Sequence, residues 1–258
     1  SFYYLAGMYR IHPTYIQEMI STGFNDLEIL AAIDQLKISE GSKYNADLVR
    51  AEFQKDIKLK TGNWSPANKI KKRNTLLIAS GPKGEEYIGA LEDYIKKSNP
   101  YVIALNTNVK LEKKLIDIYA ACNPLKFIAD IDSFKKLKRP LVAPESILDE
   151  NIKRKLSKIK IFNFGVGLEQ NTYKFFKNGT IIPKFYTLAY ALAIATCGKS
   201  KQILLAGFDG YGANDNRTKL INNLLHQYTT SKGAKKILAI TPTSYTLTFK
   251  SLYNISSW

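Results

Sequence analysis

The sequence predicts an α/β fold, with a Rossmann-like, doubly wound and mostly parallel sheet preceded by a small all-α segment. Two observations predict this class. Short apolar runs rich in β-branched residues alternate with helical patterns through residues 74–258, as strands and helices do in such folds. The runs also lack a regular polar alternation, which is typical of strands covered on both faces. A chain of 258 residues is long enough to bury a core of this kind.

The individual elements follow from these patterns in chain order. Strands are expected at the apolar runs 75–80, 101–106, 126–130, 141–144, 158–164, 202–208 and 236–242. Helices are expected at 84–97, 110–121, 132–138, 146–156, 186–197 and 216–231. The segment FYTLAYALAIATCG, which ends at Gly198, is apolar on nearly all sides. It therefore predicts a buried helix followed by a glycine cap.

The first 60 residues carry helical signals instead. Pro13 suits the first turn of a helix, and Asn25 lies three residues before Glu28, which is a capping-box pattern. A third helix is expected at about 46–58, where apolar residues recur at four-residue steps. We therefore predict a helical segment at 1–60, a linker at 61–73 and a Rossmann-like domain at 74–258.

Charge is unevenly distributed along the chain. Residues 1–40 have a net charge of −3 and the remainder carries +19, which gives +16 in total. Such a basic surface attracts phosphates, acidic sugars, nucleic acid or anionic lipid headgroups, so a membrane surface stays open as a partner. A lysine-rich coat without a ligand is an equal alternative. Nucleic acid is disfavoured as a partner because basic residues alternate with acidic ones and no recognition motif is present.

Other features of the composition limit the class of protein. The sequence has no run of about 18 apolar residues that could span a bilayer. We expect a soluble, cytoplasmic protein, with peripheral association at the inner membrane as the alternative. Cys122 and Cys197 both lie among apolar and small residues. They are expected to be buried thiols, and two cysteines are too few for a cysteine-ligated metal site.

A Gly-Pro turn and a strand-end asparagine mark the expected site. Ser80 to Gly84 follow the first strand of the domain, and Asn106 ends the second. Ligands of doubly wound sheets bind at the carboxyl ends of the strands. We expect the turn to offer free N–H groups with Lys83 beside them, which suits a phosphate. Asn106 can both donate and accept, which fits a ribose hydroxyl or a base edge. The spacing is neither a dinucleotide fingerprint nor a P-loop, and a tight turn with an asparagine cap is the alternative.

The order of five segments along the chain is informative: SGPKGEEY, VIALNTN, PLKFIADID, FYTLAYALAIATCG and QILLAGFDGYGAN. They resemble blocks of bacterial CMP-sialic acid transferases and of the related motility-accessory-factor glycosyltransferases, over about residues 74–245. The resemblance implies a nucleotide-sugar-binding domain that takes a CMP-activated acidic sugar as donor and requires no cofactor. It also implies a glycan or glycolipid acceptor in the synthesis of a bacterial surface polysaccharide, such as lipopolysaccharide.

The resemblance also implies roles for individual residues. Gly81 and Pro82 would lie at the nucleotide phosphate, Thr187 near the base, and Asp209 with Tyr211 on the sugar and leaving-group side. Asn106 would lie at the cytidine or the sugar. Together with the turn and the strand end, this gives the donor-binding candidates Ser80, Gly81, Pro82, Lys83, Asn106, Asn108 and Thr187. Two departures leave the donor open. Lys83 replaces a small serine, and no Ser-Gly or Gly-Gly pair precedes the helix that begins at Tyr186.

A second resemblance concerns the beginning of the chain. FYYLAGMYRIHPTYIQEM and EILAAIDQLK, within about residues 1–55, resemble the helical region that follows the barrel in HMG-CoA-lyase-like (4-hydroxy-2-oxovalerate) aldolases. The barrel, with its catalytic and metal-binding residues, is not in this sequence. This implies an N-terminal aldolase-like domain as the partner of this segment in a longer chain.

Glycosyl transfer with inversion requires a base for the acceptor hydroxyl and a group that stabilises the departing phosphate. Asp209 is one candidate base, with capping of its own turn as an equal alternative. His226 is the other, because histidine titrates near neutral pH, although it falls within a predicted helix. Tyr211 and Lys83 would stabilise the leaving phosphate. His12 precedes a proline and is assigned to packing or capping.

Two further alternatives remain open. Asp130 and Asp132 have a D-x-D spacing, which would bind a divalent metal ion in a UDP-sugar transferase. Asp132 is equally well explained as a helix N-cap. The last alternative is a noncatalytic domain that docks the aldolase-like partner.

Overall fold

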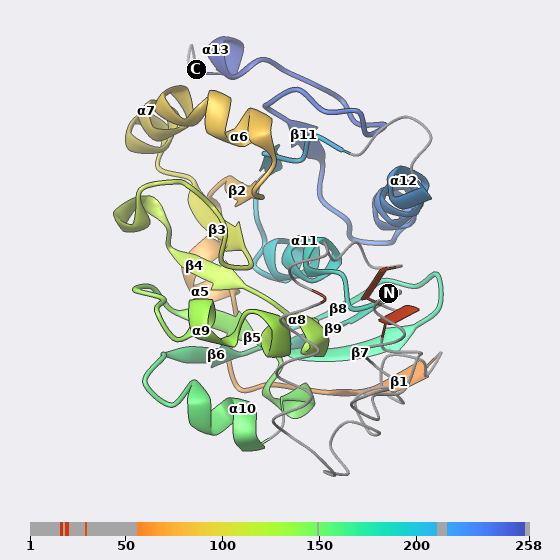
Figure 1. Cartoon of the computed structure of the whole chain (residues 1–258). Coiled ribbons are helices and arrows are strands. Elements are labelled where there is room, and N and C mark those ends of the chain that lie inside the picture. Colours follow the sequence, from red (N-terminus) through yellow and green to blue (C-terminus); the bar gives the residue numbers. More distant parts are fainter. Residues whose placement is uncertain are drawn as a thin grey trace.

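The computed structural model describes residues 16–17, 19–20, 29, 56–148, 150–210 and 216–255 (Figure 1). Its main feature is a seven-stranded sheet, in which every neighbouring pair is parallel and the strand order is β11-β10-β2-β3-β4-β5-β6. The strands are β2 (Thr75–Ile78), β3 (Tyr101–Leu105), β4 (Ile118–Ala120), β5 (Leu141–Ala143), β6 (Ile161–Asn163), β10 (Ile203–Ala206) and β11 (Ile237–Ala239). The predicted Rossmann-like α/β class is confirmed.

Helices cover both faces of this sheet. They are α5 (Ala67–Ile70), α6 (Pro82–Glu86), α7 (Ile88–Ser98), α8 (Pro124–Ala129), α9 (Ile131–Phe134), α10 (Glu150–Lys155), α11 (Thr187–Cys197), α12 (Asn216–Thr230) and α13 (Leu252–Ile255), with single 3₁₀ turns at η1 (Lys113–Leu115) and η2 (Glu145–Ile147). Successive strand residues point to opposite faces. Leu76 and Ile78 therefore join one core cluster with α7, whereas Leu77 joins a second cluster with α11.

A second, four-stranded sheet packs on the far side of α11. Its order is β1 (Asp56–Lys60), β7 (Gly165–Glu169), β9 (Gly179–Ile182) and β8 (Lys174–Phe176). β7 and β9 are parallel, while β1 and β8 pair antiparallel to their neighbours. Helix α11 lies between the two sheets, in contact with β3 and β4 on one side and with β8 and β9 on the other (Figure 1). This explains why the helix is apolar on all sides, as predicted.

The order of two neighbouring elements was predicted wrongly. Residues 126–130 were expected to be a strand but belong mainly to α8, because Pro124 at the first position favours a helix start. The strand at this place is β4, which falls inside the predicted helix 110–121. Its three residues are completely buried between β3 and β5. A run of three residues is too short for its periodicity to separate strand from helix.

The N-terminal prediction is only partly covered by the described residues. Residues 16–17, 19–20 and 29 are helical, and Ile16, Met19 and Ile29 are buried in the core cluster that contains α7. Most of the predicted helix 46–58 lies outside the described residues, but its last three residues are part of strand β1. Pairing with β7 explains this, because a neighbouring strand can override local helical preference.

Two further expectations concern thiols and membrane spans. Neither cysteine forms a disulfide; Cys122 is buried, as expected, and Cys197 is only half-buried. Burial raises the pKa of the Cys197 thiol to about 12. Across the described parts of the chain, no helix is both long and apolar enough to pass through a bilayer.

Candidate functional site

The site lies where the direction of the strand order changes. From β2 the chain proceeds through β3, β4, β5 and β6 on one side, and then returns to place β10 and β11 on the other side of β2. The helices that follow β2 and β10, α7 and α12, therefore belong to the core clusters on opposite faces of the sheet. Figure 1 shows α7 and α12 well apart. Such a switch point is the usual ligand site of an open α/β sheet.

The turns after β2 and β10 touch at this point. The N–H of Gly81 donates to the carbonyl of Gly207 over 3.0 Å. A Cβ atom on Gly81 would lie 2.4 Å from that carbonyl oxygen and 2.7 Å from the Cγ of Asp209. Gly207 itself has a φ of +72°, which favours glycine. Close approach of the two backbones thus explains the glycine that the sequence analysis singled out.

Asp209, in the turn after β10, forms a hydrogen bond with the first turn of α6. Its Oδ2 accepts a hydrogen bond of 2.6 Å from the backbone N–H of Lys83. Its Oδ1 is buried beside Gly81 and has no hydrogen-bond partner among the described residues. Burial raises the pKa of this carboxyl above 3.8, and the hydrogen bond from Lys83 offsets part of that rise. A half-buried carboxylate with a raised pKa is suited to taking up a proton.

The turn was expected to have free backbone N–H groups, and this is wrong for three residues whose N–H groups already donate hydrogen bonds. Gly81 donates to Gly207, Lys83 donates to Asp209, and Gly84 donates to the carbonyl of Gly81 over 2.8 Å. Asp209 thus occupies the position at the helix start that a phosphate would use. A phosphate bound in the same place would have to displace this carboxylate, because two anions repel each other at such distances.

A second pair of predicted residues meets at the neighbouring strand end. Asn106 follows β3 with a φ of +57°, a left-handed conformation that asparagine tolerates. The hydroxyl of Thr187, the first residue of α11, donates to its Oδ1 over 3.1 Å. The amide nitrogen of Asn106 has no such partner among the hydrogen bonds of the described residues. Asn108 is exposed, and its Oδ1 accepts from the hydroxyl of Thr107 over 3.2 Å.

The other residues of the turn face solvent. Ser80, Pro82 and Lys83 are all exposed. The ammonium group of Lys83 pairs with the carboxylate of Glu86, and this hydrogen bond together with the opposite charge raises the pKa of Lys83. An exposed pair of this kind is weak. The lysine is therefore available to an anionic ligand at the rim of the turn.

The structure does not bring the predicted histidine into this arrangement. His226 is exposed on α12, and its carbonyl accepts hydrogen bonds from the side chains of Thr229 and Thr230. No interaction of its ring with Asp209 is present in the described part of the chain. Tyr211 and His12 lie outside the described residues.

The alternative metal site at Asp130 and Asp132 has no third metal-binding side chain among the described residues. Asp130 pairs with Lys126 over 3.2 Å, and both side chains are mostly buried. Asp132 pairs separately with Lys135 over 2.7 Å at the surface. In the described ranges, no group of three His, Cys, Asp or Glu residues could hold a metal ion. Each aspartate already has a cation as its partner.

Sequence reasoning missed the contribution of the strand after α12. The hydroxyl of Thr241, just beyond β11, accepts a hydrogen bond of 2.9 Å from the N–H of Gly207. The N–H of Ser244 donates to the carbonyl of Asp209 over 2.8 Å. The segment TPTS, residues 241–244, begins within the predicted strand 236–242 and runs past its end, so its position at a strand end was the available signal.

Comparison with known proteins identifies the fold. No protein-family model and no curated protein matches the sequence. Among solved structures, the chain is similar to the MAf glycosyltransferase from Magnetospirillum magneticum AMB-1, with 9% sequence identity and a TM-score of 0.50. The match covers 79% of this chain and 37% of the glycosyltransferase. The chain therefore shares an α/β fold with that structure and spans little more than a third of its length.

Proposed function

We propose that this chain is a glycosyltransferase domain that binds a CMP-activated acidic sugar, a sialic or other ulosonic acid, at the carboxyl edge of the seven-stranded sheet. One observation carries the proposal. The ends of the neighbouring strands β10, β2 and β3 bring Asp209, Gly81 and Asn106 to the switch point, where open α/β sheets bind ligands. The fold shared with a MAf glycosyltransferase supports it.

Asp209 is the proposed base of the reaction. The bond between the anomeric carbon of the sugar and the phosphate oxygen breaks, and the acceptor oxygen forms the new bond to that carbon. The acceptor proton passes to Oδ2 of Asp209, the carboxylate oxygen that Lys83 N–H already orients. Its raised pKa supports this role. Protonation of Asp209 also removes the negative charge beside the departing CMP phosphate.

The donor nucleotide is assigned to the Asn106 side of the site. In this proposal Asn106 and Thr187 recognise the cytidine, because an amide and a hydroxyl can pair with base and ribose groups that donate or accept. Lys83 contacts the phosphate from the exposed rim, and Tyr211, which follows β10 in the sequence, is assigned the same role. This arrangement needs no cofactor. In it, Lys83 and Tyr211 contact the phosphate in place of the N–H groups of the turn.

The biological setting is a further part of the proposal. The acceptor is a glycan or glycolipid of a bacterial surface polysaccharide, and the reaction takes place in the cytoplasm or at the inner face of the membrane. An aldolase-like domain is the proposed partner of the first 55 residues. These assignments rest on the sequence resemblances alone.

The experiment is a thermal-shift or calorimetric comparison of CMP, of UDP with and without manganese, and of NAD. Stabilisation by CMP alone is expected, and it should be lost in Asn106→Ala. Asn171→Ala is the matched control, since Asn171 also has a φ of +57° and its Oδ1 also accepts a side-chain hydrogen bond, from Gln227. A response only to UDP with manganese would replace the proposal by the metal-dependent alternative through Asp130 and Asp132. No response to any of the three would favour a docking domain.

A further inference from the structure

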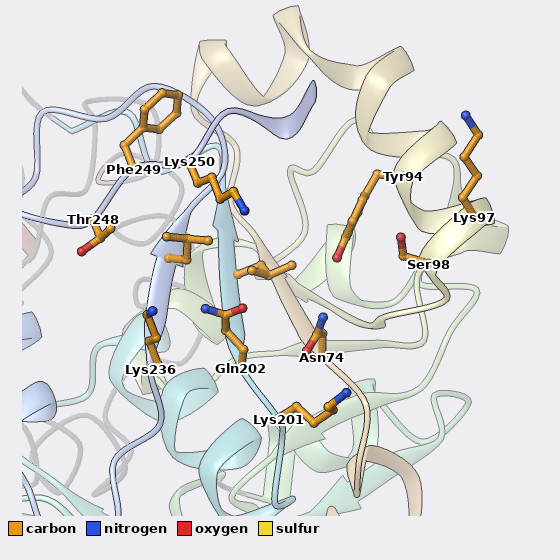
Figure 2. A pocket seen from close by; sticks show the side chains of 12 residues that line it. Asn74, Tyr94, Lys97, Ser98, Lys201, Gln202, Lys236, Thr248, Phe249 and Lys250 are labelled. Carbon is orange, nitrogen blue, oxygen red and sulfur yellow. The ribbon is translucent and has the colours of Figure 1, made fainter. Parts of the chain in front are cut away.

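A pocket of about 880 Å³ lies at the amino edge of the main sheet, opposite to the candidate donor site. Its wall includes residues that precede three neighbouring strands: Asn74 before β2, Gln202 before β10 and Lys236 before β11. The C-terminal half of α7 and the segment that ends at Lys250 form the other sides (Figure 2). The proposed transferase function does not use this pocket.

The lining of the pocket carries only positive charge. Four lysines line it, and no aspartate or glutamate does: Lys97, Lys201, Lys236 and Lys250. Lys201 and Lys236 are exposed, and in the described part of the chain neither forms an ion pair with a carboxylate. Like charges that share a concave surface repel each other and attract a counter-charge. The pocket is therefore suited to an anion with more than one negative charge.

Neutral hydrogen-bonding groups lie between the lysines. Gln202 and Asn74 are side by side, since β10 and β2 are paired, and Figure 2 shows their amides between Lys236 and Lys201. The hydroxyl of Tyr94 interacts with Asn74 at the same wall. Each amide supplies two N–H donors, which phosphate oxygens accept. The buried side chains of Leu204 and Leu238 add an apolar part to the lining.

We propose that this pocket is a second ligand site, which binds the phosphate groups of a small polyanion or of a lipid headgroup. Lysine ammonium groups act as flexible point charges and suit a cluster of phosphate oxygens better than one flat carboxylate. The exposed ring of Phe249 at the wall, 51% accessible, adds an apolar contact beside the charges. The volume is adequate for a ligand of the size of a nucleotide.

The first test measures binding of inorganic pyrophosphate by calorimetry at a constant ionic strength of about 0.15 M, so that counterion screening stays fixed. Lys201→Gln combined with Lys236→Gln should weaken binding by about tenfold or more, because two charge-assisted contacts are lost. The matched control is Lys177→Gln with Lys184→Gln, two exposed lysines outside the pocket. It makes the same change in net charge and should leave the affinity within about twofold of the wild type.

A second arm identifies the source of the phosphate. Vesicles of phosphatidylcholine with and without phosphatidylglycerol are compared in a flotation assay, with the same two variants. A lipid headgroup is supported as the ligand if the wild type and the control variant float with the anionic vesicles and the Lys201/Lys236 variant does not. Binding of pyrophosphate with that pattern supports a soluble ligand. The proposal is overturned if the wild type binds neither probe, or if both variants lose binding equally.

The two sites are separable in the same experiments. The nucleotide binds at the carboxyl edge if CMP stabilises the Lys201/Lys236 variant to the same extent as the wild type but does not stabilise Asn106→Ala. The reverse pattern would move CMP to the amino-edge pocket and overturn the proposed donor site, while supporting the pocket as a phosphate site.

Discussion

Gly81 and Asp209 connect two loops that are more than a hundred residues apart in the sequence. The Gly81 backbone contacts the Gly207 carbonyl, and the Asp209 carboxylate accepts from Lys83 at the start of α6. The contact works because glycine lets the two chains approach and because a carboxylate at a helix start satisfies an otherwise unpaired N–H. The geometry of the candidate site therefore depends on these two residues.

Gly81→Ala should destabilise the protein by about 1–3 kcal/mol, because the new Cβ would overlap a backbone carbonyl that cannot move freely. Urea denaturation measures the change. Gly89→Ala is the control, since a Cβ at this exposed position of α7 meets nothing within 4 Å. It should be neutral or stabilising by up to about 1 kcal/mol. Equal effects of the two substitutions would contradict the close contact.

The carboxyl groups of Asp209 and Asp132 should titrate on opposite sides of 3.8. Burial raises the pKa of Asp209, whereas the hydrogen bond and charge of Lys135 lower the pKa of Asp132. Titration of the side-chain carboxyl carbons by NMR measures both. A midpoint for Asp209 at or below that of Asp132 would argue against the buried carboxylate.

The two shifts have opposite effects on stability. A raised pKa means that folded Asp209 binds its proton more tightly than the unfolded chain does. Its contribution to the free energy of unfolding therefore falls as the pH rises from 3.8 through its folded pKa. The lowered pKa of Asp132 gives a contribution that is present above 3.8 and is lost as the pH falls through its folded pKa. Asp209→Asn should remove the first dependence and leave the second.

At the scale of elements, α11 organises the centre of the molecule. It is buried from Leu188 to Thr196 and packs between the two sheets. Buried hydroxyl groups fix its position. Tyr190 donates a hydrogen bond to the carbonyl of Phe164, the residue between β6 and β7. Thr196 and Tyr228 form a hydrogen bond of 2.6 Å with each other. Tyr228 comes from α12 and also accepts from the N–H of Lys235. These bonds join α11 to its neighbours where apolar contacts alone are non-directional.

A double-mutant cycle tests the bond between α11 and α12. Tyr228→Phe should cost about 1–3 kcal/mol of unfolding free energy, because the Lys235 N–H loses its acceptor in a partly buried setting. Combined with Thr196→Val, it should reveal a coupling energy of about 0.5–1.5 kcal/mol. Strict additivity of the two substitutions would show that the Thr196–Tyr228 bond contributes nothing.

For the whole molecule, the described residues before residue 74 pack against the rest of the structure. Trp64 stacks on Phe162 with ring centres 5.1 Å apart, Ile70 is fully buried, and β1 completes the four-stranded sheet. Ile16 and Met19, further upstream, are fully buried in the core as well. The predicted linker at 61–73 thus contains packed residues and helix α5.

Truncation should show this dependence stepwise. A chain that begins at Asp56 loses the upstream apolar side chains, and one that begins at Asn74 also loses β1, Trp64 and Ile70. Each kcal/mol lost should lower Tm by about 2–4 °C for a chain of this size, so Tm should fall in that order. Differential scanning calorimetry measures it. A Tm for the Asn74 chain equal to that of the full chain would support an independent domain that begins at residue 74.

Local sequence patterns were enough to predict the class of fold and the position of its main turns. Strand–helix alternation requires only local periodicity, which survives in a single chain without knowledge of neighbours. Glycine, asparagine and aspartate at strand ends indicated Gly81, Asn106 and Asp209, and the structure places all three at the carboxyl edge. The Asn106–Thr187 contact joins two residues that had been selected separately.

How these residues are partnered depends on tertiary contacts. That Asp209 takes the N–H of Lys83 depends on β10 returning to lie beside β2, which no local pattern encodes. The identity of β4 and the four-stranded sheet depend on pairing between short segments, where neighbours override propensity. The amino-edge pocket draws its lysines from separate stretches between Lys97 and Lys250. Their shared electrostatic field exists only after folding, because charge acts through distance in space and not through separation along the chain.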